Sequence, residues 1–180
     1  ESFIDFADKA IRYTLLDEEI LNEYPNLIVV KSISKSYGVP GLRLGILASS
    51  DPAYISRIRK TNAIWNINSF GEYFLQIYDK YNKTYAAACD SIAEERNRFT
   101  KKLSEINGIT VFPSEANYVL CCLNGIKAGE LTVSLLEKYN IFIKDLSSKK
   151  GFENGGYIRL AVRNKEDNDA LIAALKDILG

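Results

Sequence analysis

Residues 32–45 read Ser32-Ile33-Ser34-Lys35-Ser36-Tyr37-Gly38-Val39-Pro40-Gly41-Leu42-Arg43-Leu44-Gly45 and follow a β-rich run at 26–32. A lysine supplies the primary amine that forms a Schiff base with an aldehyde. Serine hydroxyls and an arginine guanidinium are donors suited to a phosphate, and glycines let the backbone pass close to bulky groups. The stretch therefore predicts a site for a phosphorylated aldehyde cofactor. The alternative is a polar, hairpin-like connection that carries a surface lysine.

The sequence around this stretch alternates between strand and helix patterns, which indicates an α/β or α+β fold. Residues 3–7 read as the end of a strand, and Asp51-Pro52 as the start of a helix. The further strands are expected at 26–32, 42–48, 109–112, 118–123, 141–144 and 157–162. The further helices are expected within 70–105, at 131–139 and after Asn164, which should cap the last one.

The long helical stretch divides the chain into three predicted parts. Residues 1–65 have too few strands to close a core and read as the C-terminal part of a larger sheet domain. Residues 66–105 form a linking helix, and residues 106–180 form a small, nearly complete C-terminal domain. We therefore expect the chain to be a piece of a longer protein.

Composition excludes several classes of function. The chain of 180 residues contains no His, so Ser-His-Asp catalysis and imidazole metal sites are excluded within it, and we expect no metal. Its 23 basic and 23 acidic residues balance without a basic block, which argues against nucleic-acid binding. No apolar run nears the roughly 20 residues that span a bilayer, so we expect no membrane partner.

The three cysteines, Cys89, Cys121 and Cys122, are a poor basis for disulfides because their number is odd and two are adjacent. We interpret them as small buried hydrophobic residues in a reducing compartment. The expected location is therefore the cytoplasm.

Residues 32–45 resemble the cofactor-lysine motif of fold-type-I, pyridoxal-phosphate-dependent aminotransferases of class I/II. That motif reads S-x-S-K-x-x-G-x-x-G-x-R-x-G, and the chain matches every fixed position. The resemblance implies the C-terminal half of this α/β fold, with the end of the large sheet domain, a linking helix and a small domain. It implies that Lys35 forms the Schiff base with pyridoxal 5'-phosphate and shuttles a proton at the substrate Cα. Ser32 and Arg43 would hold the cofactor phosphate, with Ser34 as a further candidate on the phosphate side.

The run from Gly156 to Arg163 (GYIRLAVR) resembles the small-domain strand of the same family, whose arginine binds the substrate carboxylate. Arg159 stands at the matching position, and a planar guanidinium pairs bidentately with a carboxylate. The alternative for Arg159 is an ion pair at a domain surface. Arg163 is either a second anion contact or a solvent-exposed cation. Residues 113–118 (PSEANY) resemble a stretch of the histidinol-phosphate aminotransferase group, in which Asn117 either lines the site or helps a strand to turn.

The same resemblance places part of the cofactor shell outside the chain. Glu1-Ser2-Phe3 matches the last three residues of the family's D-E-[A/S]-[Y/F] pattern, so the aspartate for the pyridine nitrogen would precede Glu1. Phe3 stands where many members have a tyrosine that contacts a cofactor oxygen. We therefore expect the isolated chain to be inactive. A homodimer is implied because these enzymes build their site at a subunit interface.

Three functional hypotheses follow. The first is an aminotransferase similar to histidinol-phosphate aminotransferase, moving an amino group between an amino acid and a 2-oxo acid through Lys35. The second is a lyase similar to threonine-phosphate decarboxylase, because RLAVR at 159–163 and EDN at 166–168 are closer to that branch. The third is a non-catalytic C-terminal module for folding or dimerisation.

Overall fold

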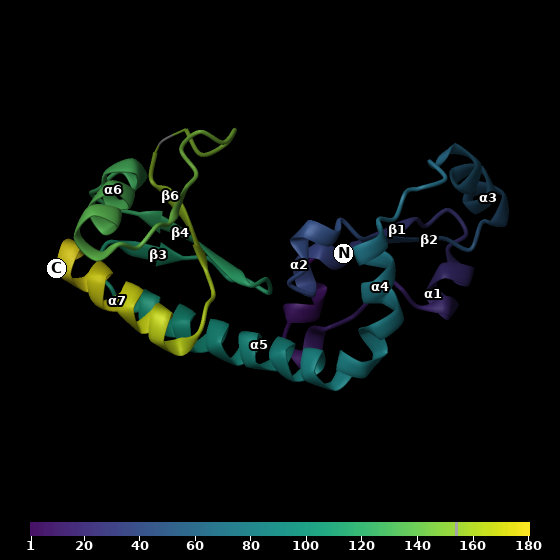
Figure 1. The fold of residues 1–180 in the computed structure, drawn as a ribbon. Coiled ribbons are helices and arrows are strands. Elements are labelled where there is room, and N and C mark those ends of the chain that lie inside the picture. Colours follow the sequence, from purple (N-terminus) through teal and green to yellow (C-terminus); the bar gives the residue numbers. More distant parts are fainter. Residues whose placement is uncertain (154) are drawn as a thin grey trace. The chain divides into compact units, whose positions relative to one another are not determined.

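The computed structural model describes residues 1–153 and 155–180 (Figure 1), and the chain divides into two compact units, residues 1–89 and 90–180. Each unit contains strands and helices, which confirms the predicted mixture of α and β structure. The boundary falls within α5 (Asn82–Ser104), the longest helix among the described residues.

The first unit contains a two-stranded antiparallel sheet surrounded by short helices. Strands β1 (Val29–Ser32) and β2 (Gly45–Ala48) pair in register, so that Ser32 lies opposite Gly45. The helices are α1 (Glu18–Glu23), α2 (Ile33–Ser36), α3 (Pro52–Thr61), α4 (Ser69–Ile77) and the start of α5, with four 3₁₀ helices, η1 (Ile4–Phe6), η2 (Lys9–Ile11), η3 (Pro40–Leu42) and η4 (Tyr78–Tyr81).

The predicted strand at residues 3–7 is wrong, because these residues form η1. The amides of Phe6 and Ala7 donate to the carbonyls of Phe3 and Ile4, which closes local turns. Glu1, just before this segment, contacts β1: its amino group donates to Val30 O at 2.5 Å and its carbonyl accepts from the Ser32 amide at 3.3 Å. The extended backbone therefore ends before Phe3.

The helix predicted from Asp51-Pro52 is confirmed as α3. The Asp51 carboxylate accepts from the amides of Ala53 at 2.9 Å and Tyr54 at 3.0 Å, and Pro52 occupies the first helical position. The long helical stretch is confirmed as α4, η4 and α5 in succession, with one 3₁₀ turn inside it.

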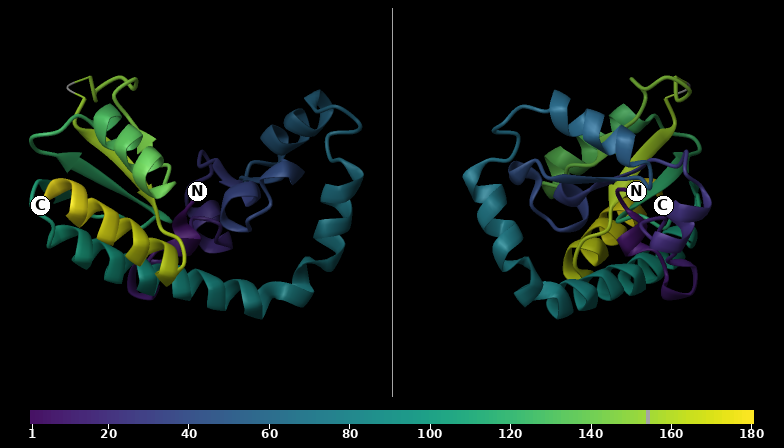
Figure 2. Two further views of the ribbon diagram at one scale, coloured as in Figure 1. Left: turned by 60° about the vertical axis from the view of Figure 1, so that its left-hand side comes forward. Right: turned by 90° about the vertical axis from the view of Figure 1, so that its right-hand side faces the viewer.

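The second unit is a four-stranded antiparallel sheet with helices on one face. The strand order is β3 (Ile109–Val111), β4 (Tyr118–Leu123), β6 (Tyr157–Ala161), β5 (Lys144–Asp145). The helices are α6 (Ala128–Tyr139), α7 (Lys165–Leu179) and the later part of α5. Figure 2 shows α7 (yellow) running alongside that part of α5 (teal). The strands predicted at 109–112, 118–123 and 157–162 and both predicted helices are confirmed.

The predicted strand at 141–144 is shorter than expected. Asn140 adopts the left-handed conformation (φ 57°) that ends α6, and the Ile141 amide donates to Leu135 O at 3.1 Å. The backbone at the start of the predicted strand therefore completes a helix cap. Within this described stretch, Lys144 and Asp145 form β5 and pair with β6.

Alternation along β4 and β6 separates the two faces of this sheet. Val119, Cys121 and Ile158 point into a core that also receives side chains from the three helices, among them Phe99, Leu103, Leu131, Leu135, Leu171 and Leu175. The opposite face carries Tyr118 and Arg159, which are accessible to solvent. One face therefore supplies stability and leaves the other for binding.

The interpretation of the cysteines is confirmed for Cys89 and Cys121, which are buried and free of disulfides. Burial, with a contribution from neighbouring Cys122, raises the pKa of the Cys121 thiol to about 12. Cys122 is partly accessible. Among the described residues, no helix is both long and apolar enough to cross a membrane.

We expect Asp51→Ala to lower the free energy of unfolding by about 1 kcal/mol, because two amides at the start of α3 lose their acceptor. Urea unfolding followed by circular dichroism measures this loss. Asp51→Asn is the matched control, since its amide oxygen still accepts. An equal loss in both variants would contradict the capping role.

Candidate active site

The loop between β1 and β2 is held by one serine hydroxyl. The buried Ser34 Oγ accepts from the Leu44 amide at 3.1 Å and donates to the Leu44 carbonyl at 3.3 Å. Its single proton is therefore used by the backbone. A contribution of Ser34 to phosphate binding stays a prediction, whereas its role in closing the loop is direct.

Lys35 follows Ser34 and lies in the last turn of α2, with an exposed side chain. Its Nζ lies 5.1 Å from the centre of the Phe3 ring. Among the described residues no carboxylate pairs with this amine. Lys35 therefore presents an accessible primary amine, the group that forms a Schiff base with an aldehyde.

Ser32 and Arg43 lie at the two ends of the same loop. Ser32 precedes α2, and within the described residues its hydroxyl makes no capping bond to that helix. Arg43 is exposed, and its Nη1 lies 3.5 Å from Pro40 O. Its backbone is left-handed (φ 55°, ψ 39°), a conformation that costs energy in a residue with a side chain. Ser32, Lys35 and Arg43 thus all belong to the connection between β1 and β2, and their hydroxyl, amine and guanidinium are groups that suit a phosphorylated aldehyde.

Two of the predicted glycines are required by this backbone. Gly38 has φ +66°, which a side chain would disfavour. A Cβ at Gly45 would lie 3.2 Å from Lys31 O on the paired strand. The backbone at these two positions disfavours a side chain, which explains why the motif has glycine there.

In the second unit, Arg159 lies on the solvent-facing side of β6. Its guanidinium carbon is 5.1 Å from the centre of the Tyr118 ring on β4. Lys144 on β5 is its direct partner across the strands, so both cations lie on the same face. The pairing of Arg159 with Lys144 was not predicted, although two cations on adjacent strands indicate an anion-binding site.

A cavity of about 610 Å³ adjoins this pair, and its walls include Phe142, Lys144, Arg159, Arg163 and Asn168. Three of these side chains are cationic, and Asp167 is the acidic residue in the wall. The local charge balance favours an anionic ligand. The alternative of an ion pair at Arg159 has no acidic partner among the described residues.

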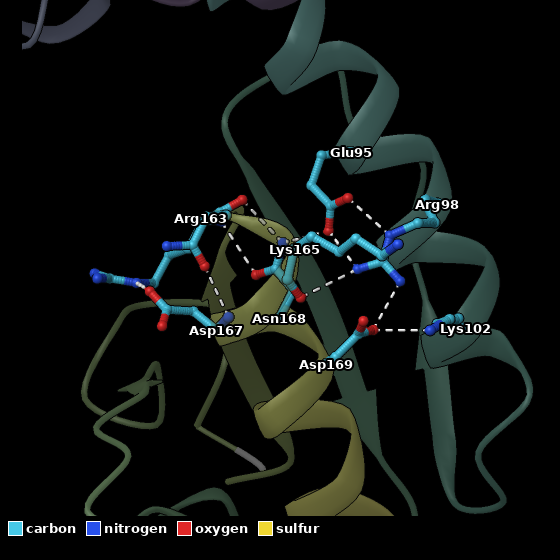
Figure 3. A network of polar contacts seen from close by, with 9 residues as sticks. Glu95, Arg98, Lys102, Arg163, Lys165, Asp167, Asn168 and Asp169 are labelled. Carbon is cyan, nitrogen blue, oxygen red and sulfur yellow. Dashed lines mark hydrogen bonds and ion pairs between the residues drawn. The ribbon is translucent and has the colours of Figure 1, made fainter.

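Arg163 lies at the wall of this cavity as an exposed cation. Its Nε is 2.7 Å from Asp167 Oδ2, and 69% of its side chain is accessible. The buried Asn168 side chain accepts from the Arg163 amide at 3.1 Å and donates to the Arg163 carbonyl at 3.0 Å (Figure 3). The Asn168 side-chain amide also donates to Glu95 Oε1 at 2.8 Å. Both alternatives for Arg163 therefore stay open, but its backbone position is fixed.

Charged residues on α5 and α7 continue this network (Figure 3). Arg98 pairs with Glu95 at 2.7 Å and with Asp169 at 2.7 Å, and Lys102 reaches Asp169 at 2.8 Å. Hydrogen bonds from Lys102 and Arg98 lower the pKa of Asp169 to about 2. Sequence analysis missed these residues, although Glu95 and Arg98 have the i, i+3 spacing of a helical pair.

The loop that carries Asn117 is held by a buried arginine. Arg96 on α5 lies 2.9 Å from Glu115 Oε2, and 1% of its side chain is accessible. The Asn117 carbonyl accepts from the Val162 amide at 2.9 Å, which extends the pairing of β4 with β6. This backbone bond does not depend on the Asn117 side chain, so both alternatives for Asn117 stay predictions.

Residues 1–175 match the family described as aminotransferase class I and II, so the chain belongs to that family. Its members are pyridoxal-phosphate-dependent, which confirms the expected cofactor class.

Three relatives illustrate the range of the family. The chain is 39% identical over 183 residues to L-serine phosphate decarboxylase of Sulfurospirillum multivorans, covering 99% of this chain and 46% of that protein. It is 31% identical to threonine-phosphate decarboxylase of Salmonella typhimurium, covering 99% and 47%. The solved histidinol-phosphate aminotransferase of Clostridium acetobutylicum superposes with a TM-score of 0.86 at 28% identity, covering 99% and 52%.

These comparisons confirm the predicted fold and the resemblance to both branches of the family. The chain spans about half the length of the relatives it matches. The activity of the whole protein and the roles of Ser32, Lys35, Arg43 and Arg159 are therefore matters for proposal.

We expect the contribution of Asp169 to stability to depend on pH. Its pKa is about 2 in the folded chain and ordinarily 3.8, so the contribution is present above 3.8 and is lost as the pH falls through 2. The difference in unfolding free energy between wild type and Asp169→Asn should shrink as the pH falls from 6 to 2, which urea unfolding at several pH values measures.

Lys101→Gln is the matched control for this pH series, because Lys101 is an exposed neighbour of Lys102 that makes no ion pair with Asp169. This variant should keep the acid dependence of wild type. A gap between wild type and Asp169→Asn that is constant with pH would contradict the lowered pKa.

Proposed function

We propose that the complete protein is a pyridoxal-phosphate-dependent enzyme that acts on a small phosphorylated amino acid and releases its carboxyl group as CO2. The observation that carries the proposal is the pairing of Arg159 with Lys144 beside a cavity whose wall also includes Arg163. A carboxylate and a phosphate on one substrate match such a set of cations. Similarity to the serine-phosphate and threonine-phosphate decarboxylases supports decarboxylation.

Amino-group transfer, the first hypothesis from the sequence, is the second candidate. It is supported by the family description and by the similarity to histidinol-phosphate aminotransferase. The PSEANY stretch at 113–118 also resembles that group. Both candidates use the same cationic wall, and they differ in which bond at the substrate Cα is broken.

The roles of the residues follow from their chemistry. Pyridoxal phosphate, when bound, supplies an aldehyde that condenses with amines and a ring that takes up an electron pair. Ser32 and Arg43 would hold its phosphate, and Lys35 is the amine that would attach it. Lys35 would then deliver a proton to Cα after CO2 departs, or remove the Cα proton in the transfer reaction.

On the substrate side, Arg159 would pair bidentately with the carboxylate, and Lys144 would contact the phosphate as a point charge. Arg163 is held by Asp167 at the wall and would add a third positive charge. Removing any of these charges should weaken binding more than it slows the chemistry.

We also propose a homodimer in the cytoplasm, inactive without the remainder of the protein. The family resemblance supports the dimer. Two buried cysteines that form no disulfide among the described residues support a reducing compartment. The alternative is a non-catalytic C-terminal module for folding or dimerisation.

We expect the complete protein with pyridoxal phosphate to convert O-phospho-L-serine or O-phospho-L-threonine to CO2 and the corresponding phosphorylated amine. Assays for CO2 and for the 2-oxo acid derived from the substrate, run on the same reaction with a second 2-oxo acid added as amino-group acceptor, measure the two outcomes. Lys35→Ala should reduce turnover by roughly 10³-fold, because the proton carrier is lost. Stoichiometric 2-oxo acid without CO2 would favour the transferase, and wild-type turnover by Lys35→Ala would contradict both.

We expect Lys144→Gln to raise KM for the phosphorylated substrate by about tenfold with kcat nearly unchanged, because a charge-assisted contact is lost on binding. Steady-state kinetics with the phosphorylated and unphosphorylated amino acid measure the effect. Lys138→Gln, which removes an exposed charge on α6, is the matched control. An equal change for both substrates would show that Lys144 does not recognise the phosphate.

A further inference from the structure

The residues Lys31 and Tyr37, one on each side of Lys35, are both connected to the carboxylate of Asp5 within the first unit. Before the lysine, Lys31 on β1 lies 2.6 Å from Asp5 Oδ1. After it, the Tyr37 ring stacks on Tyr85 of α5, with centres 3.9 Å apart and planes at 8°. The Tyr85 hydroxyl donates to Asp5 Oδ2 at 2.9 Å. Asp5 therefore joins two contacts that flank the turn of Lys35.

The ion pair at Asp5 lies mostly out of solvent, with 18% of the Asp5 side chain and 10% of the Lys31 side chain accessible. Burial alone would raise the pKa of Asp5, but the hydrogen bonds from Lys31 and Tyr85 lower it below its usual value. Burial raises the pKa of Tyr85, so its hydroxyl stays a donor. Lys31 and Asp5 each compensate the charge of the other, so removing one of them would leave an uncompensated charge out of solvent.

The helix that carries Lys35 needs such support because it is only one turn long. Helix α2 has four residues, and an isolated turn of this length is unstable in water. Ser34 fixes one side of the turn to Leu44. Tyr37 fixes the other side through Tyr85 and through a hydroxyl contact with Tyr78 at 2.9 Å.

We propose that Asp5 is a positioning residue for Lys35: by binding Lys31 and Tyr85 together, it fixes both ends of the turn that presents the amine. Asp5 acts through these two residues and takes no part in the proton transfer. The proposal rests on the proposed function of Lys35 as the cofactor lysine. It assigns a role in catalysis to a carboxylate outside the cofactor-lysine motif.

The test compares Tyr85→Phe and Asp5→Asn with wild type in the complete protein at saturating pyridoxal phosphate. Tyr85→Phe removes one hydroxyl and keeps the ring stack, and Tyr81→Phe, four residues earlier, is the matched control. We expect kcat to fall about tenfold with KM within about twofold, since a small misplacement of a catalytic group lowers the rate of the chemical step. Asp5→Glu should recover part of the loss.

Two further readouts separate positioning from a general loss of stability. Visible circular dichroism per mole of bound cofactor should weaken in Tyr85→Phe and stay unchanged in Tyr81→Phe. In the cofactor-free protein, the Tyr37 amide, which donates to Ile33 O at 3.1 Å, should exchange with solvent faster in Tyr85→Phe.

The outcomes distinguish this proposal from the one on which it rests. A folded Tyr85→Phe variant with wild-type kcat, circular dichroism and Tyr37 exchange would overturn the role of Asp5 while wild type remains active. A wild-type protein that binds no pyridoxal phosphate would overturn the proposed function instead. If Asp5→Asn does not fold, Tyr85→Phe still decides the question.

Discussion

The two hydrogen bonds between the Ser34 hydroxyl and the Leu44 backbone hold together the two ends of the loop between β1 and β2. Lys35 directly follows Ser34, and Arg43 directly precedes Leu44, so one buried hydroxyl holds the backbone beside both residues. Such a bond is stronger in a buried environment than at the surface. It also helps to hold Arg43 in a left-handed conformation that a free chain would leave.

In the second unit, a sheet positions the charged side chains. One face of its sheet packs against three helices, and the other presents Arg159 and Lys144 on neighbouring strands. Asn168 fixes the backbone of Arg163 at the end of β6, and Glu95 fixes Asn168. These cationic side chains thus extend from a sheet whose other face is packed against helices.

Much of this arrangement could be predicted where local chemistry decides the structure. The strand patterns at 26–32 and 42–48 predicted the connection that carries Lys35, but Arg43 was expected on the second strand and lies before β2. Asp51 and Asn164 predicted helix starts through their capping side chains. The strand predicted at 3–7 was wrong because local turns compete with pairing there, and residues 141–143 depend on how α6 ends. The motif alone does not show that Ser34 closes the loop, because its bonds to the Leu44 backbone join residues ten positions apart.

Contacts between distant positions could not be predicted from one sequence. Asp5 meets Lys31 across 26 residues and Tyr85 across 80, and Asn168 meets Glu95 across 73. No periodic pattern reports such pairs, because each residue alone reads as an ordinary polar position. The attachment of pyridoxal phosphate to Lys35 is measured most directly by reducing the complete, cofactor-treated protein with borohydride and mapping the label by mass spectrometry. Label on Lys35 alone is the predicted result, and label on Lys31 or scattered over surface lysines would contradict it.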